Sequence, residues 1–334
     1  MFNFKALKKA DGLLPLLLCV LLFAAGSAAA GQARYRVGIL SGIDGFAPMG
    51  DGFIARMAEL GYLEGKDVVY DFRKTNADPA AAQKAIDDFV AAKVDLIYAF
   101  PSAPAMLAKL GTAKNRIPVV FSCATLEGTT LIANPQKPGG NITGVRYPAP
   151  ELTVKRFELL QEFLPGLRRL VIFYDSKYPA NPSALEALRS SARAAGVKLL
   201  EHPVTTVAEL ERAVKCAKPA DCSADALLIM PDLLTQAPRG WPALSGFAAR
   251  RNIPIAGSAN FQTDSGALFS LIPDNIETGR IAAEMAAKIL HGVPPGTLAV
   301  ENPEARLTIS YKQARKLGIS VPPGLLSRAD RIIR

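Results

Sequence analysis

The sequence lacks most of the patterns by which enzymes are recognised. It has two histidines in 334 residues, His202 before Pro203 and His291 near the end of an expected helix. The patterns G-x-G-x-x-G, G-x-x-x-x-G-K-[ST], G-x-S-x-G and H-E-x-x-H do not occur. Acidic residues are frequent but form no convincing catalytic pair. We therefore expect no catalytic residue, no metal and no cofactor, and we interpret the chain as a non-enzyme.

Cysteine is also scarce. Three cysteines follow the first thirty residues, and there is no C-x-x-C pair, so a zinc site is not expected. In an oxidising compartment, Cys216 and Cys222 are predicted to form a disulfide across the loop CAKPADC. Cys123 ends the strand-like run PVVFSC and is predicted to be a buried free thiol.

Long apolar runs are missing after residue 30, and the one before it is short. Lys5, Lys8 and Lys9 precede the apolar run at 13–25, and three alanines close the segment at 28–30. This order is typical of a cleaved signal peptide over residues 1–30, because a spanning helix needs about 20 apolar residues. A membrane anchor and lipid attachment at Cys19 are the alternatives. The expected location is the periplasm.

Charge clusters are absent as well, although the chain is basic. The formal net charge is +9, and loss of residues 1–30 removes three lysines and one aspartate, which leaves +7. The densest groups are the pairs at 168–169 and 250–251, without interleaved aromatic residues. We therefore expect a solvated basic surface on a monomer, with no nucleic-acid partner.

What the sequence does have is a repeated alternation of short apolar runs and amphipathic segments. Strands are predicted at 36–42, 68–73, 94–100 and 118–122, with helices at 53–65, after Asp78 and at 103–113. A second round has strands at 142–147, 168–174, 197–202, 225–230 and 253–257, with helices at 151–164, 183–195, 206–216 and 241–251. Such alternation predicts parallel sheets covered by helices.

The C-terminal tail does not complete a third round. It contains an expected strand at 267–275, a helix at 276–292, and a strand and helix over 306–319. We therefore predict an α/β fold of two Rossmann-like lobes joined by a multi-strand hinge. The first lobe comprises 31–144 and about 273–298, and the second comprises 145–272 and about 299–334.

Several segments together resemble a known family. RVGILSG, AELGYLEGKDVVYDFR, IPVVFS, NPQKPGGNITGV and LTISYKQARKLGISVPPGLLSRAD resemble ABC-transporter substrate-binding proteins of the tryptophan/tyrosine-type uptake family. The resemblance covers essentially the whole chain after residue 30. It implies the type I periplasmic-binding-protein fold and a small ligand, notably an aromatic amino acid. Where members often carry Ser-Asp-Pro and Thr-Pro, this chain has Ala124-Thr125-Leu126 and Ala103-Pro104.

Ligands of open parallel sheets bind beyond the carboxyl ends of the strands. This rule selects the loops at 41–46, 100–104, 122–128, 174–178, 231–235 and 258–264. Helices starting after 102 and after 127 are expected to direct their N-termini at the cleft, where a carboxylate is favoured. The predicted hydroxyl donors to it are Ser102, Ser122 and Thr125, for each of which a helix cap is the alternative role.

An amino-acid ligand also needs an acceptor for its ammonium group. Asp232 is the first candidate, with an N-cap or a surface loop position as its alternative. Glu127, Asp175 and Asp274 are further candidates, although a cap of the helix at 276 is the favoured role of Asp274. Tyr147, Tyr174 and Phe261 are the candidates for an apolar wall, with core packing as the alternative. Trp241 is expected to pack within its own lobe.

The sequence therefore predicts a periplasmic solute-binding protein. It is expected to capture a small ligand, with an amino acid as the leading guess, between two lobes and to deliver it to an ABC permease and its ATPase. A periplasmic ligand sensor for a signalling receptor is the first alternative, and an exported enzyme is the second.

Overall fold

Apolar runs of the N-terminal half form a parallel sheet in the computed structural model, which describes residues 34–215, 223–237 and 239–334. Within these residues the sheet has five strands in the order β2-β1-β3-β4-β5. Every neighbouring pair is parallel. The strands are β1 (Tyr35–Ser41), β2 (Val68–Lys74), β3 (Leu96–Phe100), β4 (Val119–Ala124) and β5 (Ile142–Arg146).

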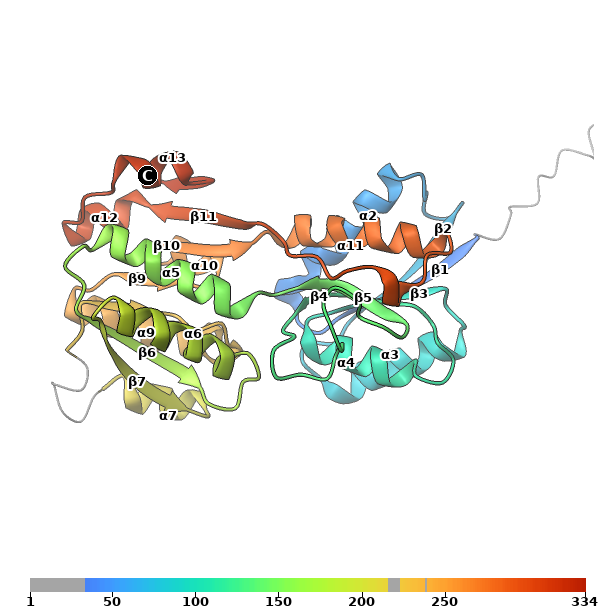
Figure 1. The fold of residues 1–334 in the computed structure, drawn as a ribbon, viewed down its shortest axis with the longest axis horizontal. Helices are drawn as coiled ribbons and strands as arrows, with labels where there is room; N and C mark the ends of the chain where they lie inside the picture. The colour runs from blue at the N-terminus through green and yellow to red at the C-terminus, as the bar shows by residue number, and fades with distance from the viewer. Residues whose placement is uncertain (1–33, 216–222, 238) are drawn as a thin grey trace, which may run out of the picture.

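Helices cover both faces of this first sheet (Figure 1). They are α2 (Ala47–Glu59), which follows the 3-10 turn η2 (Asp44–Phe46), α3 (Pro79–Ala91), α4 (Ser102–Gly111) and α11 (Asn275–Leu290), which lies beside α2. Asp78 caps α3 as predicted, because its carboxylate accepts hydrogen bonds from the N–H groups of Ala80 and Ala81. Two buried clusters of apolar side chains fill the space between the sheet and its helices.

The start of α2 differs from the prediction of a helix over 53–65, because α2 already begins at Ala47. Gly50 and Gly52 weaken the sequence signal in the first two turns of α2, since glycine is a poor helix former. Packing requires them nevertheless. A Cβ on Gly50 would lie 2.5 Å from the ring of Phe72, and a Cβ on Gly52 would lie 2.2 Å from the carbonyl oxygen of Ile276.

The second sheet has seven strands within the described residues, in the order β12-β11-β10-β9-β8-β6-β7. Its strands are β6 (Arg169–Asp175), β7 (Lys198–Val204), β8 (Ala226–Leu228), β9 (Ile255–Gly257), β10 (Phe269–Pro273), β11 (Ala305–Ser310) and β12 (Arg331–Ile333). All pairs are parallel except β10 with β11. β11 is antiparallel because the chain enters it on its way back from the first lobe.

Helices again cover both faces of the second sheet. They are α5 (Ala149–Phe163), α6 (Asn181–Ala194), α7 (Val207–Ala213), α8 (Leu233–Gln236), α9 (Gly240–Arg251), α10 (Asn260–Asp264), α12 (Tyr311–Leu317) and α13 (Pro323–Arg328). α5 and α6 bury their apolar faces in one cluster, and α7 and α9 bury theirs in another. Thr206 caps α7, and Trp241 is buried within its own lobe, as predicted.

Three segments of the described chain cross between the lobes, and they lie together at one side of the molecule (Figure 1). The first joins β5 to α5, the second joins β10 to α11 (Asn275–Leu290), and the third joins the 3-10 turn η4 (Pro295–Thr297) to β11. The first and third are bonded to each other, because Arg146 N–H donates to Glu301 O and Glu301 N–H to Gly144 O. The predicted two-lobe α/β fold with a multi-strand hinge is confirmed.

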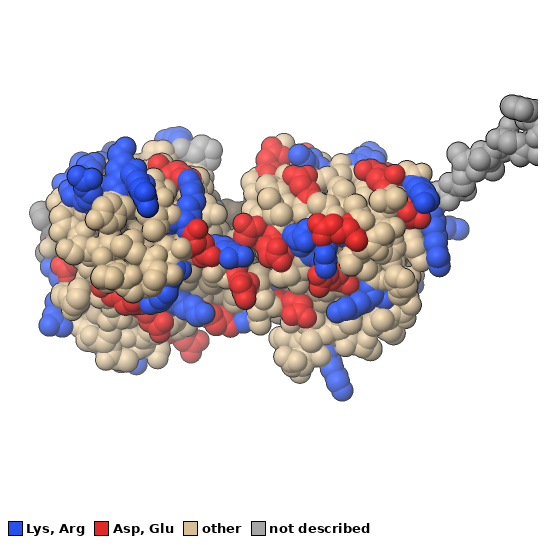
Figure 2. Space-filling model, turned by 90° about the horizontal axis from the view of Figure 1, so that it is seen from above, with Lys and Arg blue, Asp and Glu red and all other residues tan. Residues whose placement is uncertain are grey.

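Figure 2 looks onto the two lobes from above and shows a narrower waist between them. Positive and negative side chains are interspersed over the waist, whereas positive ones gather at the outer end of the second lobe. Helix α12, which Figure 1 labels at the outer end of the second lobe, carries Lys312, Arg315 and Lys316 in its sequence. No helix among the described residues combines the length and the apolar character that a membrane span requires. The predicted signal peptide and the predicted Cys216–Cys222 disulfide lie outside the described residues.

Candidate functional site

The candidate site is a cleft at the hinge, with walls from both lobes. It contains about 610 Å³ of empty space, part of it open to solvent. Phe46, Met49 and Thr125 line it from the first lobe, and Tyr178, Pro231 and Ser258 line it from the second. The crossing segments contribute further side chains, among them Arg146 and Tyr147. A molecule in this cleft would touch both lobes and the hinge at once.

The end of strand β4 shapes the wall of the first lobe. The pairing of β4 with β5 is irregular between Ser122 and Ala124, and Cys123 adopts a left-handed conformation with φ of 53°. Cys123 and Thr125 line the cleft, and the N–H of Thr125 donates to the hydroxyl of Ser102 at 3.0 Å. Thr125 is only 4% exposed, so its side chain faces a confined space.

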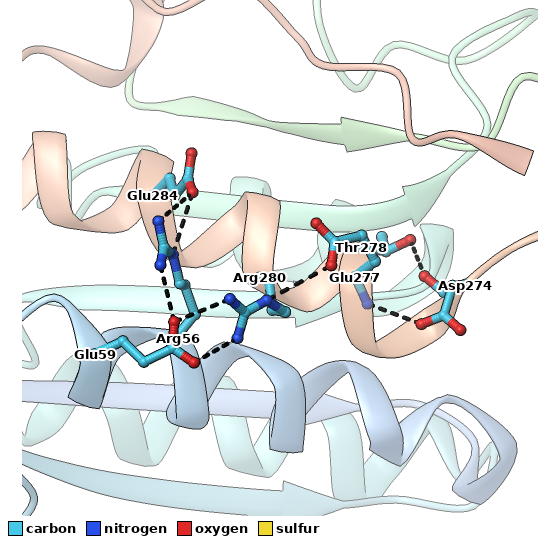
Figure 3. Close-up of polar contacts among 7 residues, drawn as sticks. All are labelled: Arg56, Glu59, Asp274, Glu277, Thr278, Arg280 and Glu284. Atoms are coloured by element: carbon cyan, nitrogen blue, oxygen red, sulfur yellow. Dashed lines mark hydrogen bonds and ion pairs between the residues drawn. The ribbon is translucent and has the colours of Figure 1, made fainter.

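Helix α11 brings its first turn to the same wall. Asp274 caps this helix, as favoured from the sequence, by accepting a hydrogen bond from the N–H of Glu277 at 2.9 Å. Asn275 and Thr278 line the cleft, and the Thr278 hydroxyl donates to the Asp274 carbonyl at 2.6 Å. Figure 3 shows these contacts at the N-terminus of the helix.

Contacts with α2 fix the position of α11. Arg56 of α2 donates to Glu284 of α11, and Arg280 of α11 donates to Glu59 of α2, each at 2.8 Å (Figure 3). The helices are also in very close backbone contact, because a Cβ on Gly279 would lie 2.0 Å from the carbonyl oxygen of Met49. The cleft-lining turn of α11 is therefore held by both ion pairs and a glycine contact.

Arg146 connects both lobes across the hinge. Its guanidinium donates to Glu127 of the first lobe and Asn302 of the third crossing segment, both at 2.6 Å. It also forms an ion pair with Glu151 of α5 in the second lobe. Arg146 is a cleft-lining cation whose charge is balanced by two carboxylates.

Asp232 lies behind the wall of the second lobe rather than on it. Its carboxylate caps α8 by accepting from Thr235 N–H at 2.8 Å, and it also accepts from Asp175 N–H and the Asn181 side chain. The residue is fully buried. Desolvation raises the pKa of its carboxyl group, and these hydrogen bonds oppose that shift. The described structure thus shows the capping role that the sequence left open.

The predicted site residues are spread between the cleft and the cores, except for Phe261, which is exposed. Thr125 and Tyr147 line the cleft, whereas the Ser122 hydroxyl is buried and accepts a hydrogen bond from Tyr98. Tyr174 is buried with its hydroxyl 3.4 Å from Glu201, and Phe261 packs edge-on against Trp241. Their roles in ligand binding stay predictions.

One predicted helix is absent from the described residues. The segment after 127 forms a turn, in which Thr129 N–H donates to Leu126 O, and then continues without a helix to β5. Gly128 has a φ of 71°, and Pro135 and Pro138 follow, so this stretch does not favour a helix. Of the two helices expected to direct their N-termini at the cleft, only α4 forms within the described residues.

Sequence reasoning missed several lining residues. Phe46, Met49 and Tyr178 contribute apolar surface to the cleft. Phe46 and Tyr178 fall at or next to strand-end loops that the sequence selected, so an aromatic residue in such a loop was the available signal. Met49 gave no such signal, because helix α2 starts earlier than the apolar pattern of the sequence indicates.

Burial suppresses ionisation of the thiol and a phenol in the cleft. Desolvation raises the pKa of Cys123 to about 12 and raises the pKa of Tyr178 as well. Cys123 is half-buried rather than fully buried, in contrast to the prediction, because its side chain borders the cleft. The cleft therefore presents neutral hydroxyl and thiol groups beside apolar surface.

Three comparisons place the chain among known proteins. A model of the family described as "ABC transporter substrate binding protein" matches residues 37–333. The chain is 27% identical to a tyrosine-binding protein of Clostridioides difficile over 252 aligned residues. This alignment covers 75% of this chain and 70% of that protein.

Two solved structures are similar over 90% of the chain. A conserved domain protein from Vibrio cholerae has a TM-score of 0.77 at 25% identity, with 99% of that chain covered. An ABC domain from Streptococcus pneumonia in complex with L-Trp has a TM-score of 0.78 at 24% identity, with 100% of that chain covered. The family is described as substrate-binding proteins, and the Streptococcus pneumonia structure is a complex with L-Trp.

Proposed function

The chain belongs to the family of ABC transporter substrate-binding proteins, and we propose that it binds an amino acid, with an aromatic one as the leading candidate. The observation that carries this proposal is the hinge cleft, whose walls come from both lobes. The tyrosine-binding relative at 27% identity supports an aromatic amino acid.

The cleft has the character that such a ligand needs, because apolar and aromatic side chains line it together with a few polar groups. Phe46, Met49, Tyr147 and Tyr178 supply apolar and aromatic surface. Such surface stabilises a buried aromatic ring by contact and by removal from water.

The proposed mechanism is capture without chemical conversion. A ligand that touches both lobes has a higher affinity for the arrangement in which the lobes approach each other, and it shifts the hinge equilibrium toward that state. An ABC permease with its ATPase is the proposed recipient. The N-terminal segment and the family support an extracytoplasmic, periplasmic location.

A thermal-shift screen of the protein without residues 1–30 tests the proposed ligand class. The panel contains the twenty amino acids and, as a matched set of other small solutes, neutral sugars and polyols. A ligand at about 100 times its Kd adds about 2.7 kcal/mol of stability, so aromatic amino acids are expected to raise the melting temperature. A shift with sugars and with no amino acid would refute the proposal.

A further inference from the structure

Two loops of the second lobe share one wall of the cleft. The loop after strand β6 carries Tyr178, and the loop after strand β8 carries Pro231 and Leu233; all three residues line the cleft. Strands β6 and β8 are parallel neighbours in the sheet, so both loops leave the same edge of it, which is where ligands of such sheets bind. The position of one loop relative to the other therefore determines the shape of this wall.

A single carboxylate joins the two loops. Oδ1 of Asp232 accepts a hydrogen bond from the N–H of Thr235 at 2.8 Å, within its own loop. Oδ2 accepts from the N–H of Asp175 at 3.1 Å and from the side-chain amide of Asn181 at 3.0 Å, and both donors belong to the loop after β6. One oxygen of Asp232 thus caps helix α8, while the other binds the neighbouring loop.

The same contacts close the loop that carries Tyr178. The side-chain amide of Asn181 also donates to the carbonyl oxygen of Asp175 at 2.8 Å. The N–H of Tyr178 donates to that carbonyl at 3.2 Å, and the carbonyl of Tyr178 accepts from the N–H of Asn181 at 3.0 Å. Tyr178 is therefore bonded to both ends of its loop, and both ends are bonded to Oδ2 of Asp232.

Burial gives this link its strength. Asp232 and Asn181 have no exposed surface, so a broken bond between them would leave a buried donor without a partner, which is costly. Hydrogen bonds to a carboxylate are also stronger than those between neutral groups. Asp78 is a contrasting cap, because it is exposed and its carboxylate accepts only from Ala80 and Ala81 of its own helix. Asp78 caps a helix, whereas Asp232 also connects two loops.

We propose that Asp232 is a positioning residue of the cleft, which holds Tyr178 in place for the ligand without touching the ligand itself. This role differs from that of an ammonium acceptor, which the sequence predicted for Asp232. The proposal rests on the proposed function and deepens it, because it names the group that fixes the aromatic wall of the second lobe. Affinity for a ligand with an aromatic ring then depends on Asp232 only through Tyr178.

Two variants separate the link between the loops from the helix cap. Asp232→Ser keeps one oxygen for capping α8, because serine is a good N-cap residue, but it has no second oxygen for Asp175 and Asn181. Asn181→Ala removes the link from the other loop and leaves Asp232 to cap α8. Asp78→Ser is the matched control, because it makes the same substitution at a capping aspartate whose two bonds stay within its own helix.

Hydrogen exchange of the ligand-free proteins, followed by mass spectrometry, tests the link without any ligand. In Asp232→Ser and Asn181→Ala, the backbone of residues 175–181 is expected to exchange at least about 10-fold faster than in the wild type, the effect of losing one hydrogen bond to a charged group. Residues 233–236 are expected to exchange as in the wild type, and Asp78→Ser is expected to leave both segments unchanged. Unchanged exchange of residues 175–181 in the two folded variants would overturn the inference.

A double-mutant cycle with L-tyrosine as the probe tests the route through Tyr178. In titration calorimetry, Asp232→Ser and Tyr178→Ala are each expected to bind about 10-fold more weakly than the wild type. The double variant is expected to bind no more weakly than Tyr178→Ala alone, because both changes remove the same contact. Losses that multiply to about 100-fold would overturn the inference, because they would indicate a direct contact of Asp232 with the ligand or a general loss of structure. Absence of L-tyrosine binding to the wild type would count against the proposed function, and the exchange result would still decide the inference.

Discussion

Substitution of Gly279 by alanine tests whether the close contact between α2 and α11 is required. A Cβ at this position would lie 2.0 Å from the carbonyl oxygen of Met49 and 2.9 Å from the N–H nitrogen of Phe53. Both atoms belong to the backbone of α2, so no side-chain rotation relieves the overlap. The helices must separate, and the buried surface between them must open.

The expected magnitude follows from two opposing effects. Overpacking a close contact costs up to about 3 kcal/mol, and we take this upper value because the overlap involves backbone atoms. Replacing glycine by alanine inside a helix is favourable by about 1 kcal/mol. The net loss in the free energy of unfolding is about 2 kcal/mol. For a folding unit of about 150–250 residues, this corresponds to a decrease of about 4–8 °C in melting temperature.

Thermal and chemical unfolding of Gly279→Ala, followed by circular dichroism, measures this loss. Gly45→Ala is the matched control, because Gly45 is exposed and an added Cβ there meets nothing within 4 Å. Weaker ligand binding is also expected for Gly279→Ala, since Thr278 and Asn275 line the cleft from the same helix turn. A variant as stable as the wild type, or more stable, would refute the reasoning, because helix propensity alone predicts a gain of about 1 kcal/mol.

Three further predictions concern a helix cap, a surface ion pair and the cleft thiol. Asp78→Ala is expected to lose about 1 kcal/mol in chemical unfolding because the α3 cap is removed. Asp78→Asn keeps the capping oxygen, and equal losses in both variants would contradict this explanation. Hydrogen bonds from Arg280 and Arg56 lower the pKa of Glu59 from 4.5 to about 2. The contribution of Glu59 to stability is therefore complete above about pH 4.5 and is lost as the pH falls toward 2. The difference in melting temperature between wild type and Glu59→Gln should shrink across that window, and a difference that does not change with pH would refute the pairing. Cys123, with its pKa raised to about 12, should react slowly with a thiol reagent at about pH 8 and more slowly with ligand bound. Peptide mass mapping measures this reaction at Cys123 separately from the other cysteines, and rapid labelling that ligand does not slow would count against its place in the cleft.

The two-lobe fold could be predicted from the sequence because its signals are local. Short apolar runs alternate with amphipathic segments, and that order alone requires parallel strands with covering helices. Caps such as Asp78 and Thr206 were also identifiable, because the capping bond involves residues two or three positions away. The antiparallel direction of β11 was not identifiable from the sequence, because it depends on where the chain returns from the first lobe.

The candidate site was less accessible to sequence reasoning, because strand-end loops contain both cleft-facing and inward-facing side chains. Thr125 and Tyr147 line the cleft, whereas Asp232 turns inward to cap α8. Which direction a loop residue takes depends on partners far away in the sequence, such as Asn181 for Asp232.

The central claim is that the hinge cleft binds an amino acid, and calorimetric titration with L-tyrosine tests it most directly. The measurement compares the wild type with Tyr178→Ala, which removes an aromatic wall of the second lobe, and with Tyr35→Phe at the far end of β1. We predict one ligand per chain for the wild type, at least about 10-fold weaker binding for Tyr178→Ala, and no change for Tyr35→Phe. Absence of binding to the wild type, or unchanged affinity in a folded Tyr178→Ala, would contradict the account.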